Sequence, residues 1–135
     1  MIFGIGSDVV EMARIRASYE RHGERFVRRI LGPREMAVHA ARSRRSAQRG
    51  LAYLATRFAA KEAVSKALGL GMRMPMTWRS AQIVNAPSGR PEVVVSGELA
   101  EFIAQRRLRL HVTVSDLENL AMAYAVAEIV DDGHA

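Results

Sequence analysis

The sequence contains no cysteine, which excludes disulfides, thiolate nucleophiles and zinc ribbons. It also lacks any run of about eighteen apolar residues that could span a membrane. Its first residues, Met-Ile-Phe-Gly, lack the charged and long apolar segments of a secretory signal. We therefore expect a cytoplasmic protein without membrane insertion. Any chemistry is left to carboxylates, hydroxyls, lysines and four histidines.

Acidic residues are also scarce relative to basic ones. The 14 Asp and Glu against 20 Lys and Arg give a net charge of +6, most of it arginine in the first half. This positive charge would attract nucleic acid, a phosphate-rich small molecule or an acidic protein. The sequence has no RNA-binding motif, and its one tryptophan, Trp78, lies outside the basic region. We therefore expect an anionic partner other than nucleic acid.

The length and composition are typical of one globular domain spanning residues 1–135, with 49% hydrophobic and 25% charged residues. Residues 2–10 predict a first strand, in which Gly4 and Gly6 permit close backbone approach and Asp8 lies near the end. Helical spacing then predicts a broken basic helix over 11–21 and onward through Phe26 and Ile30, interrupted at Gly23.

Three further segments precede the second half of the chain. A Gly-Pro pair predicts a helix from 33 to about 41, and residues 42–50 are interpreted as a solvated loop or frayed helix end. Residues 51–68 form the clearest helix, which Gly69 and Gly71 end. We then expect strands at 81–85 and 91–96, a helix at 98–107, strands at 109–115 and 122–130, and a short tail. Helices followed by antiparallel strands predict an α+β fold.

The central helix carries the side chains that could take part in catalysis or metal binding. Phe58, Glu62, Ser65 and Lys66 share one helical face. A surface pair between Glu62 and Lys66, and a helix-capping or strand-end role for Asp8, are the simpler alternatives. If the fold brings Asp8 beside Glu62, the two carboxylates suit a magnesium ion that completes its shell with water and phosphate oxygens.

Two segments resemble a known family. Residues 4–15, GIGSDVVEMARI, and 57–69, RFAAKEAVSKALG, resemble the two signature segments of the holo-[acyl-carrier-protein] synthases. The similarity extends to the turn at 85–91 and to HVTVSD at 111–116, so it spans nearly the whole chain. Ser7, Leu70 and Leu120 depart from residues common in the family.

The resemblance implies an antiparallel sheet with a long central helix, a homotrimer with active sites at subunit interfaces, and a role in fatty acid biosynthesis. It implies transfer of 4'-phosphopantetheine from coenzyme A to a serine of an acidic acyl carrier protein. Asp8 and Glu62 would hold magnesium, with manganese as the alternative ion, and Glu62 and Lys66 would be catalytic. The residues expected to contact coenzyme A are Arg57, Ser65, Lys66 and Asp8.

Two residues are candidates for the group that accepts the serine proton. Glu62 is the first candidate to orient or deprotonate the serine through water, and His111 is the second, although a histidine in a strand is also typical of a structural role. Some relatives carry histidine where Asp116 stands, so its part in coenzyme A binding is open.

The resemblance assigns Arg14, Arg21, Arg25 and Phe26 to carrier docking. With Arg29, these arginines form one stripe if the two helical pieces are nearly collinear, and a solvated basic face is the alternative. A carrier-binding scaffold without catalysis is a further alternative, which the intact Asp8, Glu62 and Lys66 oppose.

Overall fold

The computed structural model describes residues 1–130. Its elements follow in the order β1 (Ile2–Glu11), α1 (Met12–His22), α2 (Glu24–Ile30), α3 (Pro33–Arg45), α4 (Ala47–Ala67), η1 (Trp78–Ser80), β2 (Ala81–Asn85), β3 (Pro91–Val95), α5 (Gly97–Gln105), β4 (Leu108–Asp116) and β5 (Leu120–Ile129). No helix in this part of the chain is long and apolar enough to cross a membrane.

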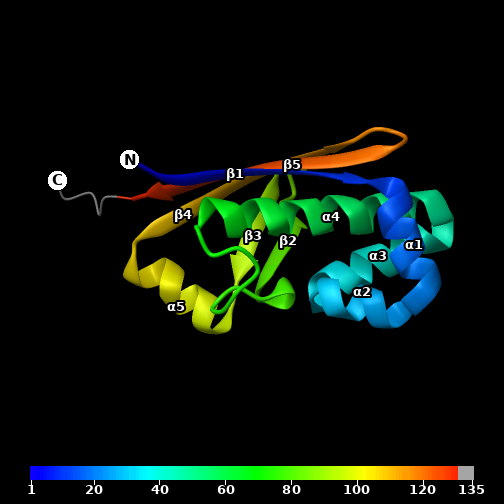
Figure 1. The fold of residues 1–135 in the computed structure, drawn as a ribbon, viewed down its shortest axis with the longest axis horizontal. Coiled ribbons are helices and arrows are strands. Elements are labelled where there is room, and N and C mark those ends of the chain that lie inside the picture. The colour runs from blue at the N-terminus through cyan, green and yellow to red at the C-terminus, as the bar shows by residue number, and fades with distance from the viewer. Residues whose placement is uncertain (131–135) are drawn as a thin grey trace.

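Two antiparallel sheets enclose the long helix α4. β1, β5 and β4 form a three-stranded sheet in that order, and β2 pairs with β3 in a separate hairpin. Figure 1 shows α4 running beneath the three-stranded sheet, with the β2–β3 hairpin and the helices α1–α3 on its other sides. The α+β class, the antiparallel sheets and the long central helix are therefore confirmed.

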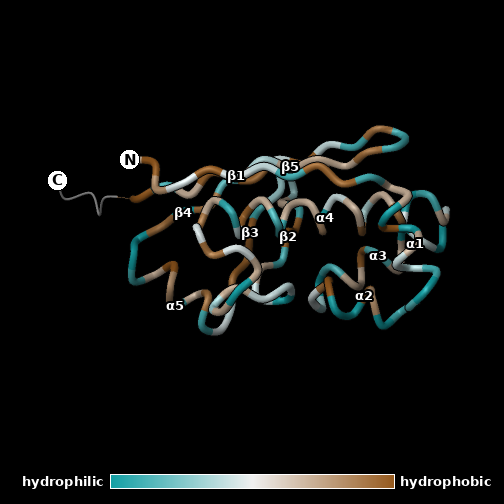
Figure 2. The backbone as a smooth tube through the Cα atoms, viewed as in Figure 1, coloured by the Kyte–Doolittle hydropathy of each residue, from teal (hydrophilic) through white to brown (hydrophobic). Residues whose placement is uncertain are grey.

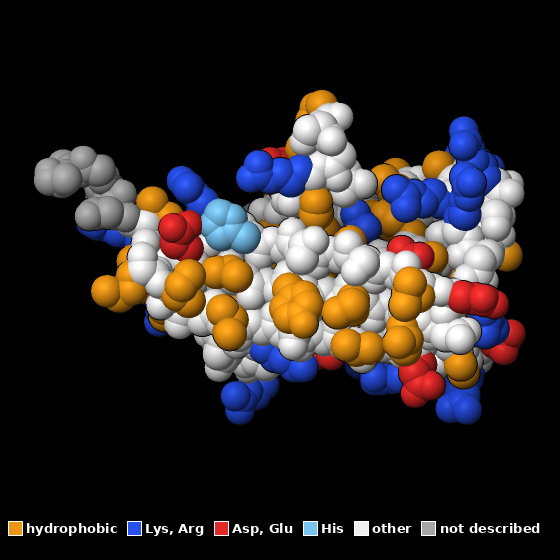
Figure 3. Space-filling view, turned by 90° about the horizontal axis from the view of Figure 1, so that it is seen from above, with side chains coloured by type: hydrophobic (Ala, Val, Ile, Leu, Met, Phe, Trp, Pro, Cys, Tyr) orange, Lys and Arg blue, Asp and Glu red, His pale blue; other side chains and the backbone are white. Residues whose placement is uncertain are grey.

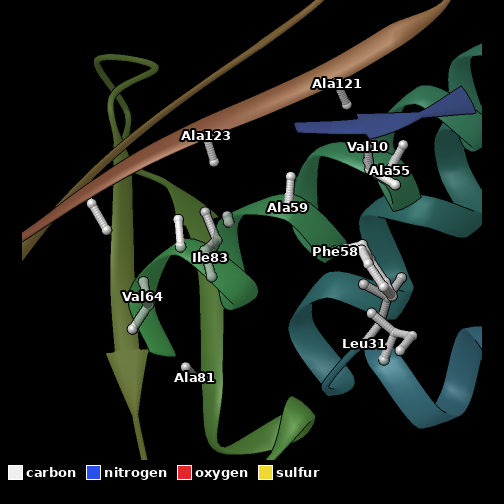
Figure 4. Packing of buried hydrophobic residues seen from close by; sticks show 14 of the residues in the cluster. Val10, Leu31, Ala55, Phe58, Ala59, Val64, Ala81, Ile83, Ala121 and Ala123 are labelled. Atoms are coloured by element: carbon white, nitrogen blue, oxygen red, sulfur yellow. The ribbon is translucent and has the colours of Figure 1, made fainter. Parts of the chain in front are cut away.

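The core forms around α4, which is buried along most of its length. Small residues of α4 face the alanines of β5, and Val64 lies on the side of Ala81 and Ile83 (Figure 4). Apolar residues also recur along β1 and β5 (Figure 2). A helix that is apolar on nearly all sides must be covered on nearly all sides, which explains why two sheets and three helices pack against it.

The strand β1 lies unusually close to α4, and two glycines make this possible. A Cβ atom at Gly4 would overlap the carbonyl oxygen of Ala67, and one at Gly6 would overlap that of Ala63. The predicted close backbone approach at these glycines is confirmed. The approach sets the position of Asp8, which follows Gly6 on the same face of β1.

The predicted loop at 42–50 is wrong, because this segment is helical except at Ser46. α3 continues to Arg45, and α4 already begins at Ala47. The Ser46 hydroxyl accepts a hydrogen bond from the Arg49 amide at 3.3 Å, which caps α4, and Gly50 is buried against Ser43. Arginine is a good helix former, so four arginines in a polar segment do not end a helix. The remaining helices and strands lie within a few residues of their predicted bounds, and the predicted tail at 133–135 lies outside the described residues.

Candidate active site

Asp8, Glu62 and Lys66 come together where β1 crosses α4. The Lys66 Nζ atom donates to the Ser7 carbonyl oxygen at 2.9 Å and lies 3.4 Å from Asp8 Oδ1. Glu62 lies one helical turn before Lys66 on the same face of α4. The ammonium group therefore joins the strand to the helix, with a carboxylate from each element beside it.

The two carboxylates lie close enough for the charge of one to affect the other. The pKa of Glu62 is raised, first by partial burial and then by the negative charge of Asp8, while Lys66 and Arg14 oppose the shift. Burial and a second carboxylate disfavour the ionised form of a carboxyl group. A nearby cation stabilises that form. Lys66 and Arg14 supply positive charge of this kind to Glu62.

A divalent ion fits this donor set. No group of three or more His, Cys, Asp or Glu residues that could hold a metal gathers within residues 1–130. Two carboxylates without histidine or thiolate make a poor zinc site, whereas magnesium is usually held by one or two carboxylates and completes its octahedron with water and phosphate oxygens. Asp8 and Glu62 are thus suited to magnesium that arrives with a phosphate-bearing substrate.

An aromatic cluster borders the carboxylates. The Phe58 ring stacks on Trp78 with centroids 4.8 Å apart, and Phe26 lies at 6.5 Å on a tilted plane. The Arg14 guanidinium lies 5.3 Å from the Phe58 centroid. The cluster links the basic helices α1 and α2 to the face of α4 that bears Glu62. Sequence reasoning missed Trp78, because its ring partner lies twenty residues away and no local pattern connects them.

The basic surface follows a bend rather than a straight helix. Arg14, Arg21 and Arg25 are exposed, and Phe26 is half-buried. Gly23 separates α1 from α2 with a positive φ of 57°, so the condition of nearly collinear pieces is not met. Figure 1 shows α2 turning away from the end of α1. A small hollow of about 130 Å³ opens on α2, lined by His22, Arg25, Phe26 and Arg29.

Arg57 and Ser65 are not brought to the carboxylates within one chain. Arg57 is buried, and its guanidinium lies 4.2 Å from the Tyr53 centroid while donating to the Ile83 carbonyl and the Asn85 side chain. Ser65 is also buried and donates to the Glu62 carbonyl oxygen at 2.7 Å.

Arg57 instead lines a second cleft, of about 240 Å³, together with Asn85, Gly89, Thr113 and Asp116. Asp8 pairs with Ala123, and Ala123 pairs with Val114, so Asp8 and this cleft lie on opposite edges of the three-stranded sheet. Two strand spacings, roughly 10 Å, separate these edges.

His111 also lies away from the carboxylates. Its Nε2 atom is 2.9 Å from Glu128 Oε1 on the open face of the sheet, whereas Asp8 lies on the face toward α4. The same open face carries a band of hydrophobic side chains (Figure 3). Ile5 is 72% exposed, Val9 57% and Tyr124 55%, which is a high exposure for such residues on one sheet face.

Comparisons with known proteins identify the class. The family model described as the 4'-phosphopantetheinyl transferase superfamily matches residues 4–125, and the chain belongs to this superfamily. The holo-[acyl-carrier-protein] synthase of Cupriavidus metallidurans is 55% identical over 128 residues, which cover 95% of this chain and 90% of that protein. Within the superfamily, the chain is a member of the holo-[acyl-carrier-protein] synthases.

Solved structures agree with this assignment. The holo-[acyl-carrier-protein] synthase of Neisseria meningitidis superposes with a TM-score of 0.86 at 35% identity, covering 95% of this chain and 99% of that one. The synthase of Bacillus anthracis, in complex with CoA (3',5'-ADP), superposes with a TM-score of 0.80 at 30% identity, covering 96% of this chain and 99% of that one. The predicted family resemblance is confirmed.

Proposed function

We propose that this chain transfers the 4'-phosphopantetheine group of coenzyme A to a serine hydroxyl of an apo acyl carrier protein. The serine Oγ forms a bond to the β-phosphorus of coenzyme A, the bond from that phosphorus to the bridging oxygen breaks, and 3',5'-ADP leaves. The serine proton passes to a base. The observation that carries the proposal is the meeting of Asp8, Glu62 and Lys66 in a member of the holo-[acyl-carrier-protein] synthases.

Asp8 and Glu62 would hold magnesium, which when bound supplies positive charge beside the diphosphate. Lys66 is fixed by the Ser7 carbonyl oxygen, so its ammonium is positioned to bind the diphosphate and neutralise charge on the leaving group. Positioning and electrostatics would therefore supply most of the rate enhancement.

Glu62 is our candidate for orienting the serine or accepting its proton through water. Because a carboxylate that holds a metal ion is a weakened base, Glu62 would act through a water molecule. His111 pairs with Glu128 on the other face of the sheet, and this favours a structural role within one chain.

The basic helices would dock the carrier protein. The exposed Arg14, Arg21 and Arg25 are suited to an acidic helix, and the half-buried Phe26 offers an apolar contact in their midst. Such charges mainly accelerate encounter and make it sensitive to salt. Arg14 also lies over the Phe58 ring, and its charge opposes the rise in the Glu62 pKa, so it adjoins both the docking surface and the carboxylates.

A homotrimer would complete the site. The apolar band on the open sheet face, which includes Ile5, Val9 and Tyr124, is typical of a surface that another subunit covers. Arg57 and Asp8 lie on opposite edges of that sheet, and a closed ring of three copies brings different edges of neighbouring subunits together. We propose that the Arg57 cleft of one subunit holds a peripheral phosphate of coenzyme A bound at the carboxylates of the next.

The test is transfer to purified apo acyl carrier protein with magnesium and coenzyme A, followed as a mass gain of the carrier and release of 3',5'-ADP. We expect Asp8→Ala and Glu62→Ala each to lower transfer by about 100-fold or more, the loss typical of removing one group that stabilises transition-state charge. Normal turnover by both variants would refute the assignment of the carboxylates.

A further inference from the structure

A buried ion pair next to the proposed site is not used by the reaction described above. Lys61 precedes Glu62 on α4, and its ammonium lies 2.6 Å from Glu35 Oε1 of α3. Both side chains have no exposed surface. Replacing a buried ion pair with well-packed apolar residues is often neutral or stabilising, so the pair is weak evidence of a contribution to stability. The hydrogen bonds that the pair makes indicate another role.

Lys61 holds the end of the docking helix α2. Its Nζ atom donates to Glu35, to the carbonyl oxygen of Ile30 at 2.7 Å, and to that of Trp78 at 2.7 Å. Ile30 is the last residue of α2, where helix carbonyls lack intrahelical partners and carry partial negative charge. The ammonium therefore binds the C-terminus of α2 and the backbone beneath the Trp78 ring with one group.

Glu35 extends the same connection to two further segments. Its Oε1 atom accepts from the amide of Gly32 at 2.9 Å, and its Oε2 atom accepts from the amide of Ile83 on β2 at 2.7 Å. The pair thus joins α2, α3, η1 and β2 to a single residue of α4. Arg79 adds a parallel contact, since its Nε atom donates to the carbonyl oxygen of Leu31 at 3.0 Å, directly after α2.

We propose that Lys61 and Glu35 are positioning residues that fix the carrier-docking helix α2 relative to the carboxylates of the active site. The inference rests on the proposed function. α2 carries Arg25 and Phe26, and few of its backbone positions approach α4 closely. Val27 and Ile30 bury its inner face in the core, and Lys61 adds a polar link from α4 to its C-terminal end. Without the pair, α2 can shift while Glu62 stays in place. Arg25 and Phe26 then no longer contact a carrier whose serine is at the reacting phosphorus, so the carrier binds more weakly in its productive position.

The decisive variant is Lys61→Met/Glu35→Gln. It removes both charges together, so the net charge of the protein and the long-range attraction of an acidic carrier are unchanged. It also avoids the unpaired buried charge that Lys61→Met alone leaves, which is strongly destabilising. Arg79→Met tests the parallel contact to the residue that follows α2, from an exposed position. Arg73→Met is its matched control, because the exposed Arg73 donates at 3.0 Å to the Leu70 carbonyl instead.

The measurement is the KM for apo carrier protein and the KM for coenzyme A, with folding checked by circular dichroism. For the double variant we expect the carrier KM to rise roughly tenfold or more, since a displacement of about 1 Å remote from the chemistry has effects of this size or larger. The coenzyme A KM should change by less than about twofold, and the salt dependence of the carrier KM should match the wild type.

The outcomes separate positioning from folding and from loss of the activity itself. A purely structural role lowers the active fraction, and thus kcat, without changing either KM. An unchanged carrier KM in a folded double variant, or a parallel rise in both KM values, overturns the proposal. Should the double variant not fold, Arg79→Met decides: a raised carrier KM against normal Arg73→Met supports the proposal, and an unchanged one overturns it. A wild-type protein without transfer would instead refute the proposed function.

Discussion

Replacing Gly6 with alanine tests how the fold brings the two carboxylates together. The added methyl group would point at α4, where it would lie 2.8 Å from the Ala67 nitrogen and 2.8 Å from the Lys66 Cβ, and closer still to the Ala63 carbonyl oxygen. Two of these three atoms belong to the helix backbone, which cannot rotate away as a side chain does. β1 must therefore move outward from α4.

The size of the effect follows from this overlap. Overpacking of a tight contact costs about 1–3 kcal/mol, and we expect the upper end because backbone atoms meet the new methyl group. For a domain of this size, about 3 kcal/mol lowers Tm by roughly 10 °C. Asp8 lies two residues further along the same face of β1, so a shift of about 1 Å at this position would lower transfer by about 100-fold.

The assay compares Gly6→Ala with Ser7→Ala. Ser7 is the adjacent residue, its side chain lies on the opposite face of β1 in an exposed position, and only its backbone oxygen contacts Lys66. Thermal unfolding and carrier modification are measured for both variants. Ser7→Ala should retain wild-type stability and transfer. A Gly6→Ala protein with unchanged Tm and full transfer would refute the claim that close contact of β1 with α4 positions Asp8.

Three further predictions concern charge and surface. Because the folded pKa of Glu62 is raised, its contribution to stability is present at low pH and lost as pH rises through the folded value, so Glu62→Gln should raise Tm of the metal-free protein at neutral pH while abolishing transfer. Burial lowers the pKa of His39 against the opposing charge of Glu24, so stability should fall as pH drops below 6.5, and His39→Leu should flatten this dependence in urea unfolding. Tyr124→Arg should convert the proposed trimer to monomers in light scattering and lower transfer by about tenfold or more, since it places a charge in the apolar band.

Each of these predictions has a contradicting result. A metal-free Glu62→Gln protein that is less stable than the wild type would show that the carboxylate is not disfavoured in the fold. An equally steep loss of stability below pH 6.5 in His39→Leu would assign that loss to other groups. A fully active Tyr124→Arg monomer would contradict a site shared between subunits. Val94→Arg, at an exposed apolar position of β3 outside the band and the Arg57 cleft, is the matched comparison.

Local pattern predicted much of the fold. The two strand glycines and Gly23 each marked a backbone feature that a side chain would prevent, and the structure bears out the close approach at Gly4 and Gly6 and the break at Gly23. The loop predicted at 42–50 is wrong because a polar segment need not be irregular. Polarity there reflects an exposed helical surface, and the signal for two helices was Ser46, a capping residue between good helix formers.

Pattern alone could not place the site. Spacing put Glu62 and Lys66 on one face, but only the resemblance connected them to Asp8, because the fold brings β1 and α4 together over a long stretch of chain. Residue spacing could not predict the Lys61–Glu35 pair either, because the two residues lie on different helices. Arg57 belongs to the same signature segment as Glu62, yet it faces another cleft, since neighbours on a helix buried on all sides point to different surroundings.

The most direct test of the account is a crystal structure of the protein with coenzyme A and manganese, whose anomalous scattering locates the ion. We predict one peak within bonding distance of the Asp8 and Glu62 carboxylates of the same subunit, in contact with the diphosphate. An ion bound at the diphosphate but remote from either carboxylate would contradict the central claim.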